Sequence, residues 1–193
     1  MFNTSITKAE INLLPLKKYD GKIVIISNEQ SMRKAAAELR DYPVLGFDTE
    51  KRPSFEKGVK NKVALVQLAV PGKVFLIRLK FTGFTRELKR IFSDEKIKKV
   101  GIGTADDIAS LLELENFNPA GFIDLNKVAE ELGIVNVGVR NLAAIILGLR
   151  ISKTQQVTNW ERLRLTDSQM NYAAVDAWAC LEIYNKLNEW GYI

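Results

Sequence analysis

The chain of 193 residues contains no histidine and a single cysteine, Cys180. Without histidine it has no Ser-His-Asp or Cys-His catalytic arrangement and no histidine general base, and nearly all catalytic zinc sites are excluded. One cysteine cannot form an internal disulfide, and its apolar neighbours indicate that Cys180 packs in the core. The metal chemistry that remains is mainly that of a hard cation bound by carboxylate oxygens.

The chain also lacks a long apolar run, the longest lying at residues 23–26 and 143–147. Both are far too short to cross a bilayer, and the N-terminus does not have the basic-then-apolar pattern of a signal peptide. We therefore expect a cytoplasmic protein with no membrane partner. Hydrophobic residues make up 47% and charged residues 26%, a composition that favours a globular protein over a disordered one.

Hydrophobic periodicity predicts an α/β protein. Residues 22–27 and 44–50 have the pattern of strands joined by a helix at 29–40, and such a β-α-β unit indicates parallel strands. Residues 62–70 and 75–77 have the pattern of a β-hairpin, which adds antiparallel strands. Short strands are predicted at 98–101 and 122–123, and helices at 84–92, 105–114, 124–133, 139–147 and 168–190. We therefore expect a mixed β-sheet flanked by helices, with a mostly helical C-terminal half.

The length of the chain suits one domain. We expect residues 22–193 to form that domain and residues 1–21 to form an N-terminal appendage. Within the appendage, Thr7 and Glu10 have the spacing of a capping box, and Pro15 is expected to end the short helix that follows it.

Two carboxylates stand one residue apart at the end of the strand predicted at 44–50. Because successive side chains of a strand alternate between faces, Asp48 and Glu50 point the same way, about 7 Å apart along the chain. Unpaired carboxylates repel each other and resist burial, so the pair needs either open water or a cation between its members. An Asp-x-Glu triplet also arises roughly once by chance in a chain of this length. The pair therefore indicates a site only if the chain supplies partners.

A further acidic residue follows the strand predicted at 98–101. Gly101 and Gly103 lead into a helix whose expected N-cap is Thr104, which makes Asp107 the third helical residue. There Asp107 can close a capping box and face the positive end of the helix dipole, which is a purely structural role. It can also be held rigidly beside a neighbouring strand end. The two glycines lack the third glycine of a dinucleotide-binding loop, so we reject that function.

The long C-terminal helix supplies the last candidates. A spacing of four residues places Tyr172 and Asp176 on one face, a single turn apart. Small residues around them, including Ala173 and Ala177, would let this helix approach the sheet closely and bring Asp176 near the other carboxylates. The alternative is a Tyr-Asp pair that only solvates an amphipathic helix.

Taken together, the acidic residues give about four negative charges, which two divalent cations would balance. Two such ions roughly 4 Å apart can stabilise both the attacking and the leaving oxygen of a phosphodiester, and this reaction needs no histidine. Tyr172, with an ordinary pKa of about 10, would mainly orient or deprotonate a metal-bound water. The four acids are Asp48, Glu50, Asp107 and Asp176.

The order of these motifs resembles a known family, the ribonuclease-H-like 3′-5′ exonucleases of the DEDD type, and most of all ribonuclease D and the Werner syndrome exonuclease domain. The resemblance covers about residues 22–190. It is carried by Phe47-Asp48-Thr49-Glu50, by residues 63–69, by residues 99–103 with Asp107, by Asn159-Trp160-Glu161, and by residues 169–177.

The resemblance implies two Mg²⁺ or Mn²⁺ ions held by the four acids, with Tyr172 positioning the water that releases 5′-mononucleotides from a 3′ end. The family has a histidine subclass and a tyrosine subclass, and a chain without histidine fits only the second. The family pattern counts six residues on from Gly101, which selects Asp107 rather than Asp106. Lys51 departs from the pattern, because relatives often carry a large apolar residue there. This departure affects how the terminal base is stacked.

The implied partner is a single-stranded or 3′-ended nucleic acid, either DNA or RNA. The net charge of +5 permits an anionic partner without requiring one. Basic side chains that neutralise phosphates, together with one or two stacking aromatics, hold single strands without reading sequence. The alternatives are that the loop lysines are merely solvated and that Trp160 is a core residue. The predicted contacts are Thr49, Lys51, Arg52, Lys153 and Trp160, with Lys57, Lys60, Lys62, Arg162 and Arg164 nearby.

Two other functions stay open. One is a non-catalytic nucleic-acid-binding module that retains the fold, although an idle site would be free to lose mutually repelling acids. The other is a ribonuclease-H-like endonuclease, which would cut a circular substrate.

Overall fold

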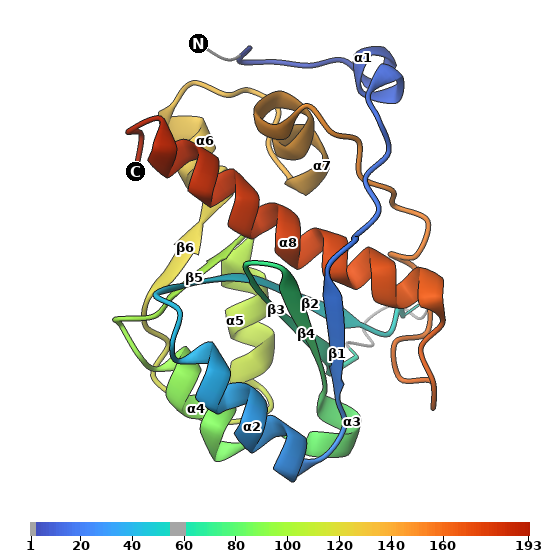
Figure 1. Ribbon diagram of the computed structural model, residues 1–193, viewed down its shortest axis with the longest axis vertical. Coiled ribbons are helices and arrows are strands. Elements are labelled where there is room, and N and C mark those ends of the chain that lie inside the picture. The colour runs from blue at the N-terminus through green and yellow to red at the C-terminus, as the bar shows by residue number, and fades with distance from the viewer. Residues whose placement is uncertain (1–2, 55–60) are drawn as a thin grey trace.

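The centre of the fold is a six-stranded mixed sheet in the order β1-β4-β3-β2-β5-β6 (Figure 1). The structure is a computed structural model that describes residues 3–54 and 61–193. Strands β2 and β3 pair antiparallel, as do β3 and β4, whereas β1-β4, β2-β5 and β5-β6 are parallel pairs. The mixed sheet predicted from the sequence is therefore confirmed. The strands are β1 Lys22–Ile26, β2 Val44–Lys51, β3 Val63–Val70, β4 Lys73–Arg78, β5 Lys98–Gly101 and β6 Phe122–Asp124.

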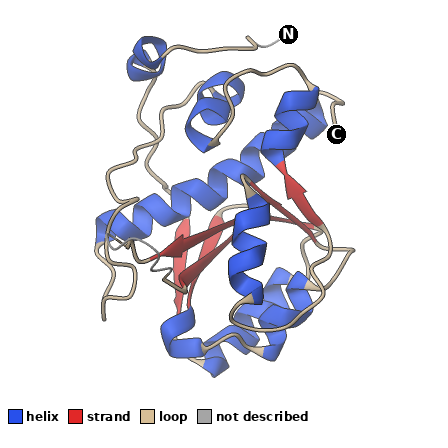
Figure 2. Cartoon of the chain, turned by 180° about the vertical axis from the view of Figure 1, so that it is seen from behind, coloured by secondary structure: helices blue, strands red, loops and turns tan. Residues whose placement is uncertain are grey.

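Helices cover both faces of the sheet. Helix α8 (Asp167–Glu189) crosses one face, and α2 (Glu29–Leu39), α4 (Arg86–Phe92) and α5 (Thr104–Leu112) lie against the other (Figures 1 and 2). The C-terminal half is mostly helical, as predicted. The remaining helices are α1 Lys8–Leu13, α3 Leu79–Thr82, α6 Leu125–Glu131, α7 Val139–Leu142 and the π-helical turn η1 Ala143–Leu147. In the part of the chain that the structure describes, none of the helices is both long and apolar enough to span a membrane.

The residues of the sheet alternate between two cores. On β3, Leu65 and Ala69 belong to the core under α8, whereas Val66 and Leu68 belong to the core under α2, α4 and α5. This period of two is what a strand covered on both faces requires. Cys180, a residue of α8, is buried, as expected from its neighbours.

The N-terminal segment packs against the C-terminal half rather than against the sheet. Thr7 forms the predicted capping box with Glu10, and Leu16 forms an isolated bridge with Arg150. In Figure 1, α1 lies on the far side of α8 from the sheet. That residues 1–21 lie outside the domain stays a prediction.

Gly46 allows α8 to approach β2 very closely. A Cβ atom at position 46 would lie 2.1 Å from the carbonyl oxygen of Ala177, far inside van der Waals contact. Ala173 and Ala177 are completely buried at this crossing, so the expectation that small residues bring α8 close to the sheet is confirmed. The crossing lies two residues before Asp48 on β2 and one residue after Asp176 on α8, so it sets the distance between these two acids.

We predict that Gly46→Ala destabilises the protein by about 1–3 kcal/mol, because the added methyl group overpacks the crossing and forces α8 outward. The measurement is denaturant unfolding, with divalent-cation binding measured on the same samples and expected to weaken. Gly133→Ala is the matched control, because Gly133 has a φ of 77° and no neighbour near its would-be Cβ. That variant should lose stability through backbone strain alone and keep its cation affinity. Equal cation binding in Gly46→Ala and the wild type would contradict the prediction.

Candidate metal centre and active site

Strand β2 directs two carboxylates toward α8. Leu45 and Phe47 pack in the core under α2, α4 and α5, so the alternate residues Gly46, Asp48 and Glu50 face α8. The register of β2 against β3 shifts between Glu50 and Lys51, a bulge of the kind that often ends pairing beside a functional site. The predicted common direction of Asp48 and Glu50 agrees with this arrangement.

Three carboxylates converge at this point. One oxygen each from Asp48, Glu50 and Asp176 lies within 4.8 Å of the others. Glu50 and Asp176 are buried, at 8% and 5% exposed. The Oδ1 atom of Asp176 is itself buried and has no hydrogen-bond partner. A set of hard oxygen donors with an uncommitted buried atom fits a divalent cation, and the cluster is compatible with binding one.

Burial and mutual repulsion raise the pKa of each member of this cluster. Burial, reinforced by the charge of Asp48, raises the pKa of Glu50 to about 10. Burial likewise raises the pKa of Asp48 well above its usual range, with the charges of Asp176 and Asp107 adding to it. Burial raises the pKa of Asp176 to about 7, while the Tyr172 hydroxyl and the charge of Lys153 oppose that rise. A cation would replace the protons that the cluster otherwise keeps.

Asp107 reaches the site from α5, on the other side of β2. The hydroxyl of Thr49 donates a hydrogen bond to Asp107 Oδ1, as the alternation of β2 allows, since Thr49 faces α5. Asp107 is not one of the three converging carboxylates, yet its charge raises the pKa of both Asp48 and Glu50. Burial raises the pKa of Asp107 to about 6, opposed by the Thr49 hydrogen bond and the charge of Lys51.

The predicted cap of α5 is wrong. The N-cap is Gly103, in the left-handed conformation with a φ of 70°, and α5 begins at Thr104. Thr104 is buried, so its side chain packs instead of capping the helix. Asp107 therefore closes no capping box, and its carboxylate is free to accept from Thr49.

Tyr172 lies one turn before Asp176 on α8, as predicted. Burial raises the pKa of its hydroxyl above the ordinary value of 10.0, and the neighbouring charges of Asp176 and Glu50 add to the rise. The hydroxyl therefore keeps its proton at neutral pH. Its ring packs against Trp160, with centroids 6.0 Å apart.

The structure changes the interpretation of several predicted nucleic-acid contacts. Trp160 is completely buried, so it has no ring face to offer a base, and the core alternative is the correct one. Thr49 and Lys51 both point toward α5, where Thr49 holds Asp107 and Lys51 donates to the Ser110 hydroxyl. Lys57 and Lys60 lie outside the described residues.

The other predicted basic contacts lie in the segments that follow β2 and precede α8. Arg52 is 55% exposed and forms an ion pair with Glu161 at 3.6 Å. Lys153 is near enough to Asp176 to lower its pKa. Arg162 and Arg164 are exposed.

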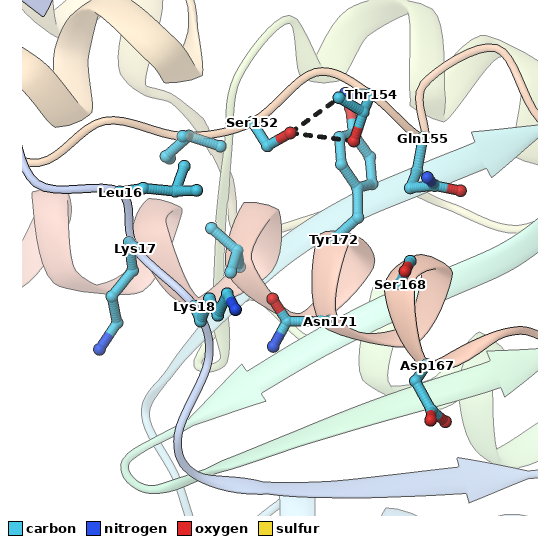
Figure 3. A pocket seen from close by; sticks show the side chains of 12 residues that line it. Leu16, Lys17, Lys18, Ser152, Thr154, Gln155, Asp167, Ser168, Asn171 and Tyr172 are labelled. Atoms are coloured by element: carbon cyan, nitrogen blue, oxygen red, sulfur yellow. Dashed lines mark hydrogen bonds between the residues drawn. The ribbon is translucent and has the colours of Figure 1, made fainter. Parts of the chain in front are cut away.

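A cavity of about 320 Å³ adjoins Tyr172 on the side of α8 that faces the N-terminal segment. In Figure 3 the Tyr172 side chain extends from α8 toward the loop that carries Ser152 and Thr154. Leu16 and Lys18 form the opposite wall. Tyr172 therefore borders both the carboxylate cluster and this cavity.

Two polar residues near the site were missed from the sequence. Arg78 is buried, and its guanidinium donates to the carbonyl oxygens of Arg162 and Leu163, which fixes the loop before α8. Gln67 is completely buried in β3. The signal for Gln67 was present, because it is the single polar residue in the strand sequence VALVQLAV.

A family model described as 3′-5′ exonuclease matches residues 23–190. The chain is 33% identical to the bifunctional 3′-5′ exonuclease/ATP-dependent helicase WRN of Mus musculus, over 92% of this chain and 13% of that protein. It is 31% identical to the exonuclease mut-7 homolog of Homo sapiens, over 85% of this chain and 22% of that protein. The chain thus spans under a quarter of the length of these two relatives.

Solved structures share the fold. The Aedes aegypti Nibbler EXO domain superposes with a TM-score of 0.81 at 22% identity, covering 91% of each chain. Escherichia coli RNase D superposes with a TM-score of 0.78 at 22% identity, over 89% of this chain and 47% of that one. The six-stranded sheet and its covering helices are therefore a fold that this chain shares with both structures.

The raised pKa values predict that the cation-free protein loses stability as pH rises. A carboxyl with a raised folded pKa holds a proton that the unfolded chain has released, so the free energy of unfolding falls with pH between the two values. For Asp176 that window runs from about 4 in the unfolded chain to about 7 in the folded protein. The melting temperature in a chelator should thus be lower at pH 8 than at pH 5.

Asp176→Asn should raise the cation-free stability at pH 8 by at least about 1 kcal/mol, since one pKa unit corresponds to about 1.4 kcal/mol. It should also flatten the pH profile. The control is Asp167→Asn, at the exposed start of the same helix, which should give no gain. Identical pH profiles for the two variants would contradict the prediction.

Proposed function

The chain belongs to the 3′-5′ exonuclease family, and from this premise we propose that it hydrolyses nucleic-acid phosphodiester bonds from the 3′ end with two divalent cations, releasing 5′-mononucleotides. The observation that carries the proposal is the convergence of Asp48, Glu50 and Asp176 at one point, with Tyr172 beside them and Asp107 across β2. This is a constellation for phosphoryl transfer that works without histidine.

The cations would be Mg²⁺ or Mn²⁺, held by the three converging carboxylates and by Asp107, and when bound they would polarise the phosphodiester and balance the charge that develops on it. Asp107 is suited to the outer position, because Thr49 fixes its carboxylate from the α5 side. The charge of Asp107 raises the pKa of Asp48 and of Glu50, although Asp107 is not one of the three converging carboxylates.

Tyr172 and Glu50 would orient the attacking water. The Tyr172 hydroxyl keeps its proton at neutral pH, so it acts as a hydrogen-bonding partner and not as a strong base. Glu50 lies at the buried end of β2, where its carboxylate can accept a hydrogen bond from the same water. The burial of both groups excludes bulk water and holds their geometry.

The substrate strand would run over the basic rim formed by Arg52, Lys153, Arg162 and Arg164. Arg78 holds the backbone of the loop that carries two of these arginines, so their positions are fixed before the strand binds. A relative from Trypanosoma brucei, RNase D, has been solved in complex with RNA U12. Either DNA or RNA fits a rim that contacts phosphates alone.

A non-catalytic binding module is the weaker alternative. Gathering three mutually repelling carboxylates, two of them buried, costs stability, and a module that only binds nucleic acid gains nothing from them. An endonuclease would need room for the strand to continue beyond the site on both sides of the cleaved bond. It would therefore cut circular substrates.

We predict Mg²⁺- or Mn²⁺-dependent release of mononucleotides from strands with a 3′-hydroxyl. Asp48→Ala should lower the rate by a factor on the order of 10³ or more. Tyr172→Phe should lower it by about 10²-fold through loss of water orientation. The measurement is digestion of matched 3′-labelled and 5′-labelled DNA and RNA strands.

The control for this experiment is Tyr42→Phe, a tyrosine in the opposite core, which should keep wild-type activity. If the wild type leaves both DNA and RNA intact in either cation, the enzymatic proposal fails. Cleavage of a circular single strand would instead support the endonuclease.

The basic rim predicts a salt-dependent affinity for single strands. Lys153→Ala and Arg162→Ala should each weaken binding about equally for all sequences and reduce the slope of log affinity against log salt by about 1. Fluorescence anisotropy in the Asp48→Ala background keeps the strand intact during the measurement. Lys34→Ala, on the exposed side of α2, is the control and should change neither quantity. If the slope of log affinity against log salt is unchanged in both rim variants, the strand does not bind along the basic rim.

A further inference from the structure

Gln67 is a buried amide without protein partners. It lies in the middle of β3, its side chain is completely buried, and neither its Nε2 nor its Oε1 atom has a hydrogen-bond partner. In the described part of the chain, no other residue leaves two buried side-chain polar atoms without a partner. An unsatisfied buried amide destabilises a fold, typically by about as much as several ordinary hydrogen bonds contribute.

The position of Gln67 in the sheet suggests why an unpartnered amide is buried there. In the antiparallel register of β2 and β3, Gln67 lies directly opposite Asp48. Its strand neighbours at two residues' distance, Leu65 and Ala69, both belong to the core under α8, so the Gln67 side chain lies on the same face as the Asp48 side chain. Directly opposed side chains of an antiparallel pair begin about 5 Å apart, within the reach of a glutamine amide.

We propose that Gln67 is a positioning residue for the metal centre: the amide, which has no partner in the cation-free protein, would donate its N–H to the Asp48 carboxylate oxygen that faces away from the cation once the cation is bound. The inference rests on the proposed cation site. A carboxylate that gives one oxygen to a cation needs a donor for the other, and such donors fix the orientation of the ligand and tune its affinity. In this arrangement the amide oxygen of Gln67 points away from the carboxylate cluster. If it faced the cluster, it would add a fourth acceptor group to three carboxylates.

Gln169 shows what a purely structural buried glutamine looks like in this protein. It is 1% exposed. Its Nε2 donates to Thr158 Oγ1 at 3.0 Å and to the Asn159 carbonyl oxygen at 3.2 Å, and its Oε1 accepts from the Thr166 backbone at 3.2 Å. Gln169 thus has partners at both ends, all within the loop and helix start that it fixes. Gln67 has none, and the group opposite it is a predicted metal ligand.

The positioning role proposed for Gln67 and the structural role of Gln169 predict opposite effects of substitution on stability and on cation affinity. Gln67→Met and Gln67→Leu replace the unpartnered amide with apolar groups, so the melting temperature without cation should rise. Their affinity for Mn²⁺, titrated calorimetrically without nucleic acid, should fall by about 10–100-fold, as is typical when the outer partner of a metal ligand is removed. Gln169→Met is the matched control: its melting temperature should fall, while its Mn²⁺ affinity should stay close to that of the wild type.

Wild-type Mn²⁺ affinity in both Gln67 variants would overturn the proposal, whatever their activity. Loss of folding in both variants would also overturn it, because the amide would then be stabilising the cation-free fold through partners of its own. The outcome is separable from the proposed function. A wild type that binds Mn²⁺ but does not hydrolyse nucleic acid would defeat the exonuclease proposal and leave the role of Gln67 to be decided by the titrations.

Discussion

The electrostatic repulsion among buried carboxylates is the constraint on which this site depends. Asp48, Glu50 and Asp176 place oxygens within 4.8 Å of one another, and burial raises the pKa of each. No basic side chain forms an ion pair with any of the three among the described residues. The fold therefore holds together groups that would separate in water, and the energy for this comes from the apolar packing around them.

That packing is concentrated where α8 crosses β2. The absence of a side chain at Gly46 lets the helix backbone lie directly on the strand, and the buried alanines on α8 extend the contact. The crossing fixes Asp176 beside Asp48 by backbone geometry, which is more rigid than any loop. Because α8 lies so close to β2, little room remains for basic side chains beside the carboxylates. The close contact of helix and strand therefore accounts both for the rigidity of the cluster and for its unrelieved repulsion.

Much of this could be predicted from the sequence, for reasons of periodicity. The alternation of β2 predicts that Asp48 and Glu50 share a face, and the spacing of four on α8 predicts that Tyr172 and Asp176 do. What failed depended on tertiary contacts. Thr104 has the side chain of an N-cap but is buried, so Gly103 takes that position. Trp160 has the side chain of a stacking platform but fills the core under α8, and nothing in its local sequence distinguishes the two.

The alternation of β2 also accounts for Lys51, where the family pattern breaks. Asp48 and Glu50 face α8, whereas Thr49 and Lys51 face α5, so one strand supplies the carboxylate cluster from one face and the support of Asp107 from the other. Lys51 is held by Ser110, and its charge opposes the rise in the pKa of Asp107. Asp107, with a pKa of about 6, is thus ionised at neutral pH while Glu50, with a pKa of about 10, is not. A cation held by the cluster would replace the protons that Asp48 and Glu50 otherwise keep. In this chain the residue after Glu50 therefore acts on Asp107 and does not face the carboxylate cluster.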